Sequence, residues 1–419
     1  MYLKKLKCLN CGKEYAPGSF SYKCSQCGGI LEIQYDYNSV IKSGFKEKML
    51  NCRHIPNIWY FKELLPLENE KNIITLEEGN TPIIRSKIFV QDKDKPRLDF
   101  KDESRNPTCS FKDRPLSVAI SKVKEDGKNW VITSTHGNAG IALAAYSARA
   151  GLNSLVIVPN KSPEDSLAVI QAYGTKVFKI KGDISDAYNF SLEISDEFNI
   201  VNLATTFLSP YTTEGDKTIA FEIFCQYNGV LPDWILFPIG DGPLLVGCYK
   251  GFKELLDLDL INKIPRLVAV QSEKCAPIAR AYINNIDEVE VWDNDEETIA
   301  MGINEPLKGY PEDGTITLKR IKDSGGLAIT VNENEIKGAM FDLIRKEGLF
   351  PEPTGSVGFA GAKKLYAQNY LKKEDKVLVL LTGGGMTDIC IYKKLQTEPK
   401  LIDKDLGAFK NIWQNEISG

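Results

Sequence analysis

The stretch Asp233–Leu256, DWILFPIGDGPLLVGCYKGFKELL, holds a short apolar run, a glycine turn and a longer helical segment in succession. The run Asp233–Ile239 has the length and composition of a strand that is buried on both faces. Gly240–Pro243 (GDGP) then turns the chain into a helix that we expect over Leu244–Leu256. Parallel strands need a crossover of this kind, so the order predicts a parallel sheet with helices on its faces.

The same strand–helix order recurs over most of the chain from about residue 70 onward. We expect further strands at Trp130–Thr133, Ser154–Pro159, Lys176–Ile180, Leu267–Gln271 and Val377–Leu381. We expect further helices at Ile141–Ala150, Ser162–Tyr173, Ile184–Phe198 and Pro277–Ile283. This alternation predicts an α/β fold with parallel sheets covered on both faces. The stretch from about Phe45 to Lys71 lacks the pattern, and we expect it to be an irregular linker.

Length and charge limit the classes of protein that this chain can represent. It has 419 residues and a formal net charge of −4, from 52 Lys and Arg against 56 Asp and Glu. At about 100–200 residues per domain, two or three domains are expected. The near balance of charge gives no electrostatic reason to expect nucleic acid or a membrane surface as partner. No apolar run has the length of a signal-peptide core or a bilayer span, so we expect a cytoplasmic protein with reduced cysteines.

Four of the ten cysteines lie within the first 27 residues, as Cys8 with Cys11 and Cys24 with Cys27. Each pair forms a CxxCG turn, and two such turns can direct four thiolates at one metal ion. The pattern predicts a closed, structural zinc site in a small ribbon that needs its metal to fold. The alternatives are four unligated cysteines in a hairpin and a redox dithiol. The second is disfavoured because no βαβ pattern surrounds either pair.

Histidine is scarce, since the chain contains only His54 and His136. A metal centre with three histidine ligands is therefore excluded. If the chain is an enzyme, then lysine, carboxylate or tyrosine side chains, or a cofactor, must carry most of its acid–base chemistry.

Glycine turns lie where expected strands end, which is where parallel α/β sheets bind their ligands. They are Thr135–Gly140 (THGNAG), Gly240–Pro243 (GDGP) and Thr382–Gly385 (TGGG). A fourth tight turn, Asn106–Arg114 (NPTCSFKDR), carries Lys112 beside Phe111. Each motif alone is weak evidence, and Lys112 alone would be read as a surface lysine. The turn GDGP does not complete a GxGxxG dinucleotide fingerprint, and no GxxxxGK[ST] phosphate loop is present.

Taken together, these turns resemble the pyridoxal-phosphate enzymes of the tryptophan-synthase-β fold (fold type II), and among them the threonine synthases. The resemblance extends through EEGNTP (Glu77–Pro82), TEGDKTIAFEI (Thr213–Ile223), AVQSEKCAPI (Ala269–Ile278), EGLFPEPTGS (Glu347–Ser356) and LLTGGGMTD (Leu380–Asp388). It implies two parallel-sheet domains preceded by the four-cysteine zinc ribbon. The expected boundaries are 1–40 for the ribbon, 72–115 with 212–419 for a large cofactor domain, and 116–211 for a small α/β domain.

The resemblance also implies roles for individual residues. Lys112 corresponds to the catalytic lysine that forms a Schiff base with pyridoxal 5′-phosphate. Other cofactor contacts would come from Phe111, Asn138, Gly240, Asp241, Gly242, Leu244 and Thr382. Substrate contacts would come from Ser110, Thr135, His136 and Lys217. The implied reaction converts O-phospho-L-homoserine and water to L-threonine and phosphate, and a homodimer is expected.

Several residues depart from the family's pattern, and all of them lie at anion-binding motifs. Asp241 and Pro243 stand in a phosphate turn that usually reads Gly-Asn-Gly-Gly-Asn, and Thr212 replaces an arginine. His136 stands near the expected substrate carboxylate, either as a cation that recovers part of the lost charge or as a neutral cap of its turn. A cysteate-synthase-like enzyme acting on phosphoserine, an amino-acid dehydratase and an inactive paralogue used for interaction therefore remain as alternatives.

Overall fold

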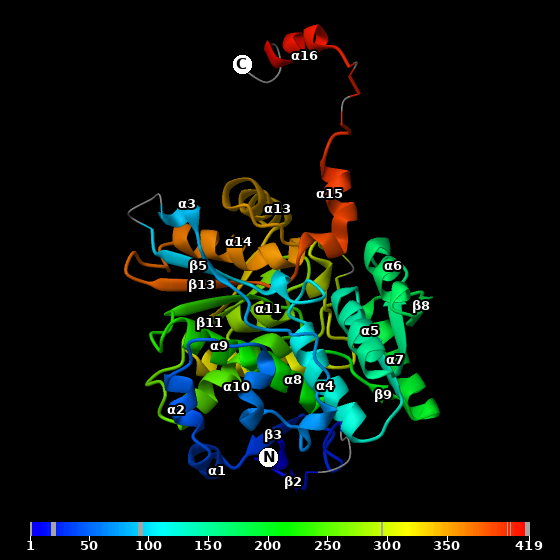
Figure 1. Ribbon diagram of the computed structural model, residues 1–419, viewed down its shortest axis with the longest axis vertical. Helices are drawn as coiled ribbons and strands as arrows, with labels where there is room; N and C mark the ends of the chain where they lie inside the picture. The colour runs from blue at the N-terminus through cyan, green and yellow to red at the C-terminus, as the bar shows by residue number, and fades with distance from the viewer. Residues whose placement is uncertain are drawn as a thin grey trace.

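The computed structural model describes residues 2–17, 22–90, 95–294, 296–399, 401–402 and 404–414. Its strands form a six-stranded sheet, a four-stranded sheet and a three-stranded N-terminal sheet. The first two sheets lie side by side with helices around them, and the N-terminal sheet lies beneath the larger one (Figure 1).

The larger sheet has the strand order β12-β11-β10-β13-β5-β4. Its strands are β4 (Ile83–Arg85), β5 (Arg97–Asp102), β10 (Trp234–Pro238), β11 (Arg266–Ser272), β12 (Leu327–Val331) and β13 (Lys376–Leu381). All neighbours pair in parallel except β4, which runs antiparallel to β5 at one edge. The expected parallel sheet is thus confirmed, with one antiparallel edge strand.

Helices cover both faces of this sheet (Figure 1). On one face lie α13 (Glu333–Asp342) and α14 (Pro353–Ala367). On the other lie α8 (Pro210–Asp216), α9 (Thr218–Gln226) and α10 (Pro243–Asp257). The helix α10 begins at Pro243, the last residue of the GDGP turn and one residue before the start that the sequence predicts.

The smaller sheet is parallel throughout, in the order β8-β7-β6-β9. Its strands are β6 (Trp130–Ser134), β7 (Asn153–Pro159), β8 (Lys176–Ile180) and β9 (Val201–Asn202). The helices α5 (Asn138–Ala150), α6 (Glu164–Ala172) and α7 (Ile184–Phe198) connect them. Helix α4 (Asp113–Glu125) packs against both α5 and α8 and so joins the two sheet units.

The N-terminal sheet is antiparallel, with β1 (Leu3–Cys8) between β2 (Glu14–Tyr15) and β3 (Leu31–Tyr35). The segment after it is not the irregular linker that the sequence predicted. After α1 (Tyr37–Lys42), the stretch from about Phe45 to Lys71 contains α2 (Phe45–Leu50), η1 (Ile58–Leu64) and the start of η2 (Glu70–Asn72). Its side chains Ile58, Trp59, Leu65 and Leu67 are buried with Val118 of α4, so apolar packing fixes this segment on the protein.

The remaining elements fill the connections and the C-terminal segment. They are α3 (Lys87–Val90), η3 (Glu103–Arg105), α11 (Pro277–Ile283), η4 (Met301–Ile303), α12 (Pro311–Asp323), η5 (Leu343–Glu347), η6 (Gly385–Asp388), α15 (Ile389–Leu395) and α16 (Leu406–Ile412). The helix α15 packs against α6 and η6, and α16 lies away from the body (Figure 1).

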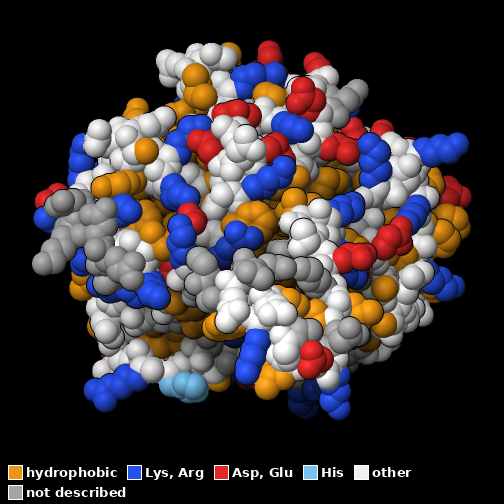
Figure 2. All heavy atoms as spheres, turned by 90° about the horizontal axis from the view of Figure 1, so that it is seen from above, with side chains coloured by type: hydrophobic (Ala, Val, Ile, Leu, Met, Phe, Trp, Pro, Cys, Tyr) orange, Lys and Arg blue, Asp and Glu red, His pale blue; other side chains and the backbone are white. Residues whose placement is uncertain are grey.

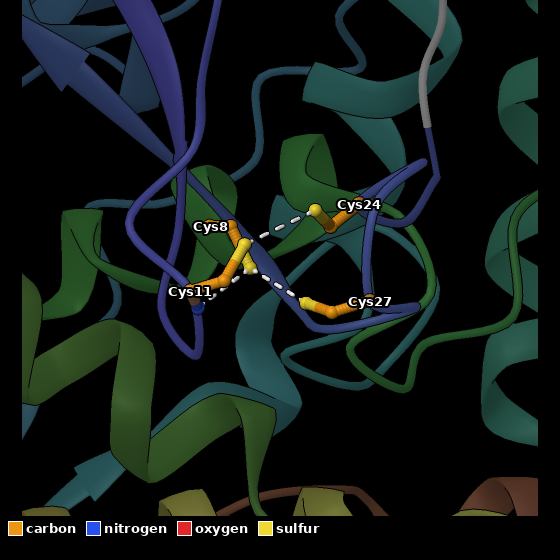
Figure 3. Close-up of side chains that lie close together, drawn as sticks. All are labelled: Cys8, Cys11, Cys24 and Cys27. Carbon is orange, nitrogen blue, oxygen red and sulfur yellow. Dashed lines mark hydrogen bonds between the residues drawn. The ribbon is translucent and has the colours of Figure 1, made fainter.

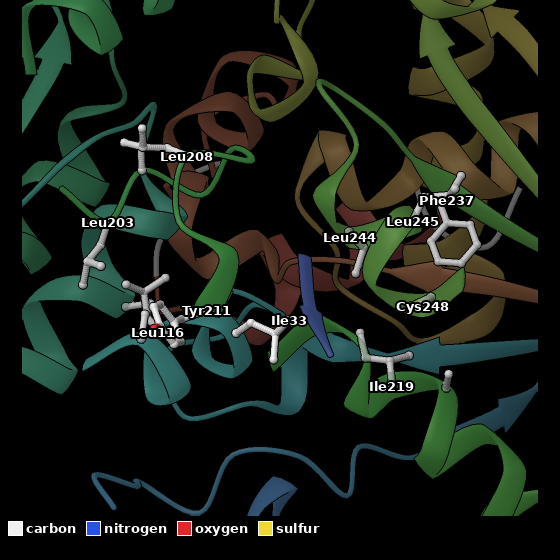
Figure 4. Close-up of a cluster of buried hydrophobic side chains, with 14 of the residues drawn as sticks. Ile33, Leu116, Leu203, Leu208, Tyr211, Ile219, Phe237, Leu244, Leu245 and Cys248 are labelled. Carbon is white, nitrogen blue, oxygen red and sulfur yellow. The ribbon is translucent and has the colours of Figure 1, made fainter. Parts of the chain in front are cut away.

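One apolar core runs from the N-terminal sheet into both larger sheets. Figure 4 shows Ile33 of the N-terminal sheet among buried side chains of α4, α8, α9 and α10. The core therefore fixes the N-terminal sheet to the rest of the chain, whereas the domain boundaries expected from the sequence remain predictions. None of the described helices is long and apolar enough to cross a membrane. Acidic and basic side chains are interspersed over the face seen in Figure 2.

Candidate active site

A cavity of about 1080 Å³, counting the solvent at its mouth, is lined by residues of three glycine turns and the Lys112 turn. The turns follow β6, β10 and β13, so the cavity lies at the carboxyl ends of strands from both larger sheets. The structure brings together most of the side chains that the sequence singled out.

Lys112 is the residue directly before α4, and its position is fixed by the TGGG turn beside it. The backbone N–H of Phe111 donates to the carbonyl of Thr382 (3.0 Å), and that of Gly384 donates to the carbonyl of Cys109 (2.8 Å). Cys109 adopts a left-handed conformation (φ 64°) that tightens the turn. These bonds hold Lys112 and Thr382 at one cavity, although 270 positions separate them in the sequence.

The amine of Lys112 extends into the cavity and donates a hydrogen bond to Thr205 Oγ1 (2.6 Å). It lies 4.7 Å from the centroid of the Phe111 ring. Burial lowers the pKa of Lys112, although the carboxyl groups of Asp241, Asp216, Glu305 and Glu352 act in the opposite direction. A lysine with a lowered pKa is more often neutral and can act as a nucleophile or base.

Two further side chains of the cavity carry hydrogen-bonding groups. Thr382 is 3% exposed, and its hydroxyl has no hydrogen-bond partner among the described residues. Asn138, the first residue of α5, donates through Nδ2 to Glu352 Oε1 (2.8 Å). Burial raises the pKa of Glu352 to about 7. An unpaired buried hydroxyl is costly, so the Thr382 position favours a ligand with a complementary atom.

The GDGP turn presents the N-terminus of α10 to the cavity. The amides of the first helical turn, including that of Leu244, have no acceptor within the helix and can bind an anion. Gly242 has a φ of 113°, which strongly favours glycine. Two features oppose anion binding: Pro243 has no N–H, and the Gly242 N–H donates to the carboxylate of Asp241 (3.0 Å).

Thr135 and His136 also line the cavity, but within the described part of the chain only the side chain of Thr135 has a hydrogen-bond partner of normal geometry. Thr135 Oγ1 accepts from the N–H of Gly137 (2.9 Å) and so stabilises its own turn. Burial lowers the pKa of His136 to about 4, and the backbone near Asn304 offsets this only in part. Neither ring nitrogen has a hydrogen-bond partner of normal geometry among the described residues. His136 is therefore neutral near pH 7 and does not supply the cation considered from the sequence.

The structure does not place Ser110 or Lys217 on the cavity wall. Ser110 is fully buried, and its Oγ accepts from the N–H of Lys112 (3.3 Å). Lys217 is also fully buried, with its amine 2.6 Å from Glu214 and 3.1 Å from Glu254. Moving this lysine toward a substrate would remove the ion pair of the buried Glu254, whereas Glu214 would keep its second ion pair, with Lys250. The ion pairs of Lys217 do not favour the expected substrate contact, which stays a prediction, and Ser110 accepts from the backbone of Lys112.

Several side chains that line the cavity were not predicted as site residues, among them Thr205, Glu305 and Glu352. Glu352 lies within the motif EGLFPEPTGS, but its residue type alone suggested no role. Thr205 follows β9, a two-residue strand that is too short for its hydrophobic pattern to be recognised. Glu305 lies in a connection with no strand or helix pattern.

The four N-terminal cysteines form a second candidate site (Figure 3). The sulfur atoms of Cys8 and Cys27 are 3.5 Å apart, and those of Cys11 and Cys24 are 3.6 Å apart. All four lie within 4.8 Å of one another. A tetrahedral site with zinc–sulfur distances of about 2.3 Å separates its sulfurs by about 3.8 Å, so the four thiols fit such a site.

A model of the family described as pyridoxal-phosphate-dependent enzymes matches residues 74–383, which include Lys112, the THGNAG and GDGP turns and Thr382. The chain belongs to this family. It is 35% identical over 407 residues to a threonine synthase from Methanocaldococcus jannaschii, covering 97% of this chain and 98% of that protein. A threonine synthase from Methanosarcina acetivorans is 34% identical over 406 residues, with 97% of each chain covered.

The fold is also similar to a solved structure, the processed form of threonine deaminase isoform 2 from Solanum lycopersicum. The TM-score is 0.65 at 17% identity, over 91% of this chain and 97% of that one. The family resemblance and the fold class expected from the sequence are thus confirmed.

The cavity fits pyridoxal phosphate at three points. Lys112 offers an amine, Thr382 offers a buried hydroxyl without a partner, and α10 offers free amides for a phosphate. Asp241 is the exception, because a carboxylate beside a phosphate dianion is repulsive. Burial raises the pKa of Asp241, so protonation reduces that repulsion.

Proposed function

We propose that this protein is a threonine synthase that converts O-phospho-L-homoserine and water to L-threonine and phosphate. The observation that carries the proposal is the convergence of the Lys112 amine, the Thr382 hydroxyl and the N-terminus of α10 on one cavity. The relatives that match 97% of the chain and bear the name threonine synthase support the choice of reaction.

Pyridoxal phosphate, when bound, withdraws electrons from the substrate's Cα and makes its C–H bond acidic. Lys112 would hold the cofactor, Thr382 would contact its pyridine nitrogen, and Asn138 its ring oxygen. Phe111 and the turn Gly240, Asp241, Gly242 and Leu244 would complete the cofactor site.

Lys112 would also act as the base that moves protons at Cα and Cβ of the substrate. Its lowered pKa favours the neutral amine that this role requires. The hydrogen bond to Thr205 fixes the amine relative to the cavity wall. Thr135 and His136, on the adjacent turn, would contact the substrate's carboxylate side.

One observation favours a second candidate, an elimination enzyme acting on an uncharged hydroxy amino acid. Among the described residues that line the cavity, Lys112 is the only cation, against the carboxyl groups of Asp241, Glu305, Glu352 and Asp388. Such a wall disfavours a substrate phosphate unless some of these groups are protonated. Burial raises the pKa of Glu305 to about 8 and that of Glu352 to about 7, which reduces the negative charge of the wall near neutral pH.

The other expectations are carried forward as part of the proposal. Cys8, Cys11, Cys24 and Cys27 would bind one structural zinc ion, and the close approach of their sulfurs supports this. The protein would be a cytoplasmic homodimer, with a ribbon at 1–40, a large domain of 72–115 and 212–419, and a small domain of 116–211.

A comparison of four substrates tests the reaction. The holoenzyme is incubated separately with O-phosphohomoserine, O-phosphoserine, threonine and serine, and phosphate, amino acids and 2-oxo acids are quantified. We expect phosphate and threonine in equal amounts from O-phosphohomoserine alone. Ammonia and a 2-oxo acid from threonine or serine, with no release of phosphate from either phosphorylated substrate, would establish the second candidate instead.

A further inference from the structure

Residues 203–209 connect β9 to α8 and run between the four-cysteine ribbon and the active-site cavity. The two ends of this loop are anchored in the main core by Leu203 and Leu208, which are 0% and 4% exposed (Figure 4). Between them, Thr205 and Thr206 line the cavity. The loop is therefore a short, well-packed segment with one side toward the reaction site.

The other side of the loop rests on the ribbon. Phe207 packs with Ile30 and with Val246 of α10, and these three side chains are 3%, 4% and 5% exposed. Leu9, which lies between Cys8 and Cys11, packs against the same cluster. Ile30 follows Cys27 by three residues. The apolar contact to the loop is thus made by residues next to both cysteine pairs.

Polar bonds beside this cluster attach the ribbon to both sheet units. The hydroxyl of Tyr22 accepts from the N–H of Asn202 in β9. Lys23 forms an ion pair with Glu312 of α12 (2.7 Å), and the next residue, Asp313, accepts from the N–H of Phe207 (3.1 Å). A shift of the ribbon would therefore reach the loop by two routes, through Asn202 just before it and through α12, which contacts Phe207.

Phe207, the loop residue that packs with the ribbon, lies two positions after Thr205. The hydroxyl of Thr205 accepts the hydrogen bond from the amine of Lys112. We infer that the ribbon is a positioning device for catalysis: its contact through Ile30 and Phe207 keeps Thr205 against Lys112. The inference rests on the proposed role of Lys112. It adds a role in positioning Thr205 to the purely structural role that the cysteine pattern predicts for the ribbon.

A bound metal ion would contribute to this positioning by stabilising the ribbon. A ribbon of three short strands buries little apolar area, so four cysteine ligands would fix the positions of Leu9 and Ile30. Loss of the metal would loosen the packing on Phe207 before it disturbed the larger core. Loosened packing of the ribbon would then weaken the hydrogen bond between Thr205 and the amine of Lys112.

Two isoleucine substitutions in the ribbon separate this role from general stability. Ile30→Ala removes the contact to Phe207, whereas Ile33→Ala removes an equally buried side chain that packs in the main core instead. Metal content is measured for both variants, and hydrogen–deuterium exchange is followed in the holoenzymes. We expect both to keep their metal, and Ile30→Ala alone to speed amide exchange in residues 203–209, by about tenfold or more.

The pH profile of kcat gives a readout that simple destabilisation would not change. Thr205 accepts a hydrogen bond from the amine of Lys112, which favours the charged form, so losing it should lower the pKa of the amine. The acid limb of kcat with O-phosphohomoserine should move to lower pH by roughly half a unit or more in Thr205→Val and in Ile30→Ala. Asp241, Asp216, Glu305 and Glu352 also face the amine, and they are the same in all variants.

The double variant tests whether both changes act through one contact. If they do, Ile30→Ala should add almost nothing to the shift that Thr205→Val already causes. Unchanged exchange in residues 203–209 of Ile30→Ala would overturn the inference, and so would additive shifts or an equal effect of Ile33→Ala. A wild-type enzyme that makes no threonine would contradict the proposed function, while the exchange comparison would still decide whether the ribbon holds the loop.

Discussion

Asn138 Nδ2 donates a hydrogen bond to Glu352 Oε1 at 2.8 Å and thereby links the two sheet units inside the cavity. Asn138 is the first residue of α5 beside the smaller sheet, and Glu352 directly precedes α14 on the larger one. The other carboxylate oxygen of Glu352 accepts from Thr387 Oγ1 (3.3 Å). Glu352 therefore orients Asn138, which we propose as a contact of the cofactor ring.

Replacing Glu352 by glutamine should change the pH dependence of stability. Burial raises the pKa of Glu352 to about 7, so the folded state holds its proton more tightly than the unfolded state does. The free energy of unfolding of the wild type should therefore fall as pH rises from about 4.5 to 7. Over the same pH range it should fall by up to ~3 kcal/mol less in Glu352→Gln, which has no carboxyl group to ionise at this position. Urea unfolding at pH 5 and pH 8 measures the difference, and Glu374→Gln, at an exposed position, is the control. Parallel pH curves for wild type and Glu352→Gln would contradict this prediction.

Replacing Asp241 by asparagine should strengthen cofactor binding. Asparagine can still accept from the Gly242 N–H but carries no charge beside the phosphate. Because burial raises the pKa of Asp241, more of the aspartate is ionised as pH rises, so the gain should grow with pH and reach several-fold in Kd. Equilibrium dialysis with pyridoxal phosphate measures it, with Asp388→Asn as a second cavity carboxyl for comparison. Weaker binding by Asp241→Asn at every pH would show that the carboxylate is needed.

Replacing His136 by alanine should change KM by a factor that does not depend on pH. The pKa of about 4 leaves the imidazole neutral from about pH 6 to 8.5, so no charge is lost over this range. KM for O-phosphohomoserine is compared in wild type and variant at several pH values within it. A defect that shrinks steadily toward high pH would mean that His136 binds the substrate as a cation.

Serine at Cys8 should remove the ribbon's metal and lower stability. One zinc ion per chain is expected in wild type, measured by atomic absorption, and much less than one in Cys8→Ser. Cys390→Ser, outside the cluster, serves as the control. Full zinc content in Cys8→Ser would place the metal elsewhere, and no zinc in wild type prepared with added metal would refute the site.

The sequence predicted the strands and helices whose pattern of apolar residues is regular within the segment itself. Lys176–Ile180, Ile184–Phe198 and Pro277–Ile283 have the bounds expected from the sequence. The strand β5 (RLDFKD) was missed because its charged residues hide the pattern. Lys101 is fully buried with Glu222, and Asp99 is paired with arginines, so contacts from distant segments make these residues compatible with a buried strand.

The sequence predicted those cavity residues that lie within a recognisable turn motif. Lys112, Asn138, Thr382 and the GDGP turn all line the cavity. Lys217 could not be placed this way, because its partner Glu254 lies 37 positions away on α10. Glu352 and Thr205 were missed for the same reason, since their significance lies in contacts with Asn138 and Lys112 that no local pattern encodes.

Oxygen tracing with O-phosphohomoserine in ¹⁸O-labelled water tests the central claim most directly. If water adds at Cβ after the carbon–oxygen bond to phosphate breaks, threonine carries one ¹⁸O in its hydroxyl and the released phosphate carries none. We expect this result from wild type, and neither product from Lys112→Ala. Labelled phosphate with homoserine, or 2-oxobutanoate without threonine, would contradict the account.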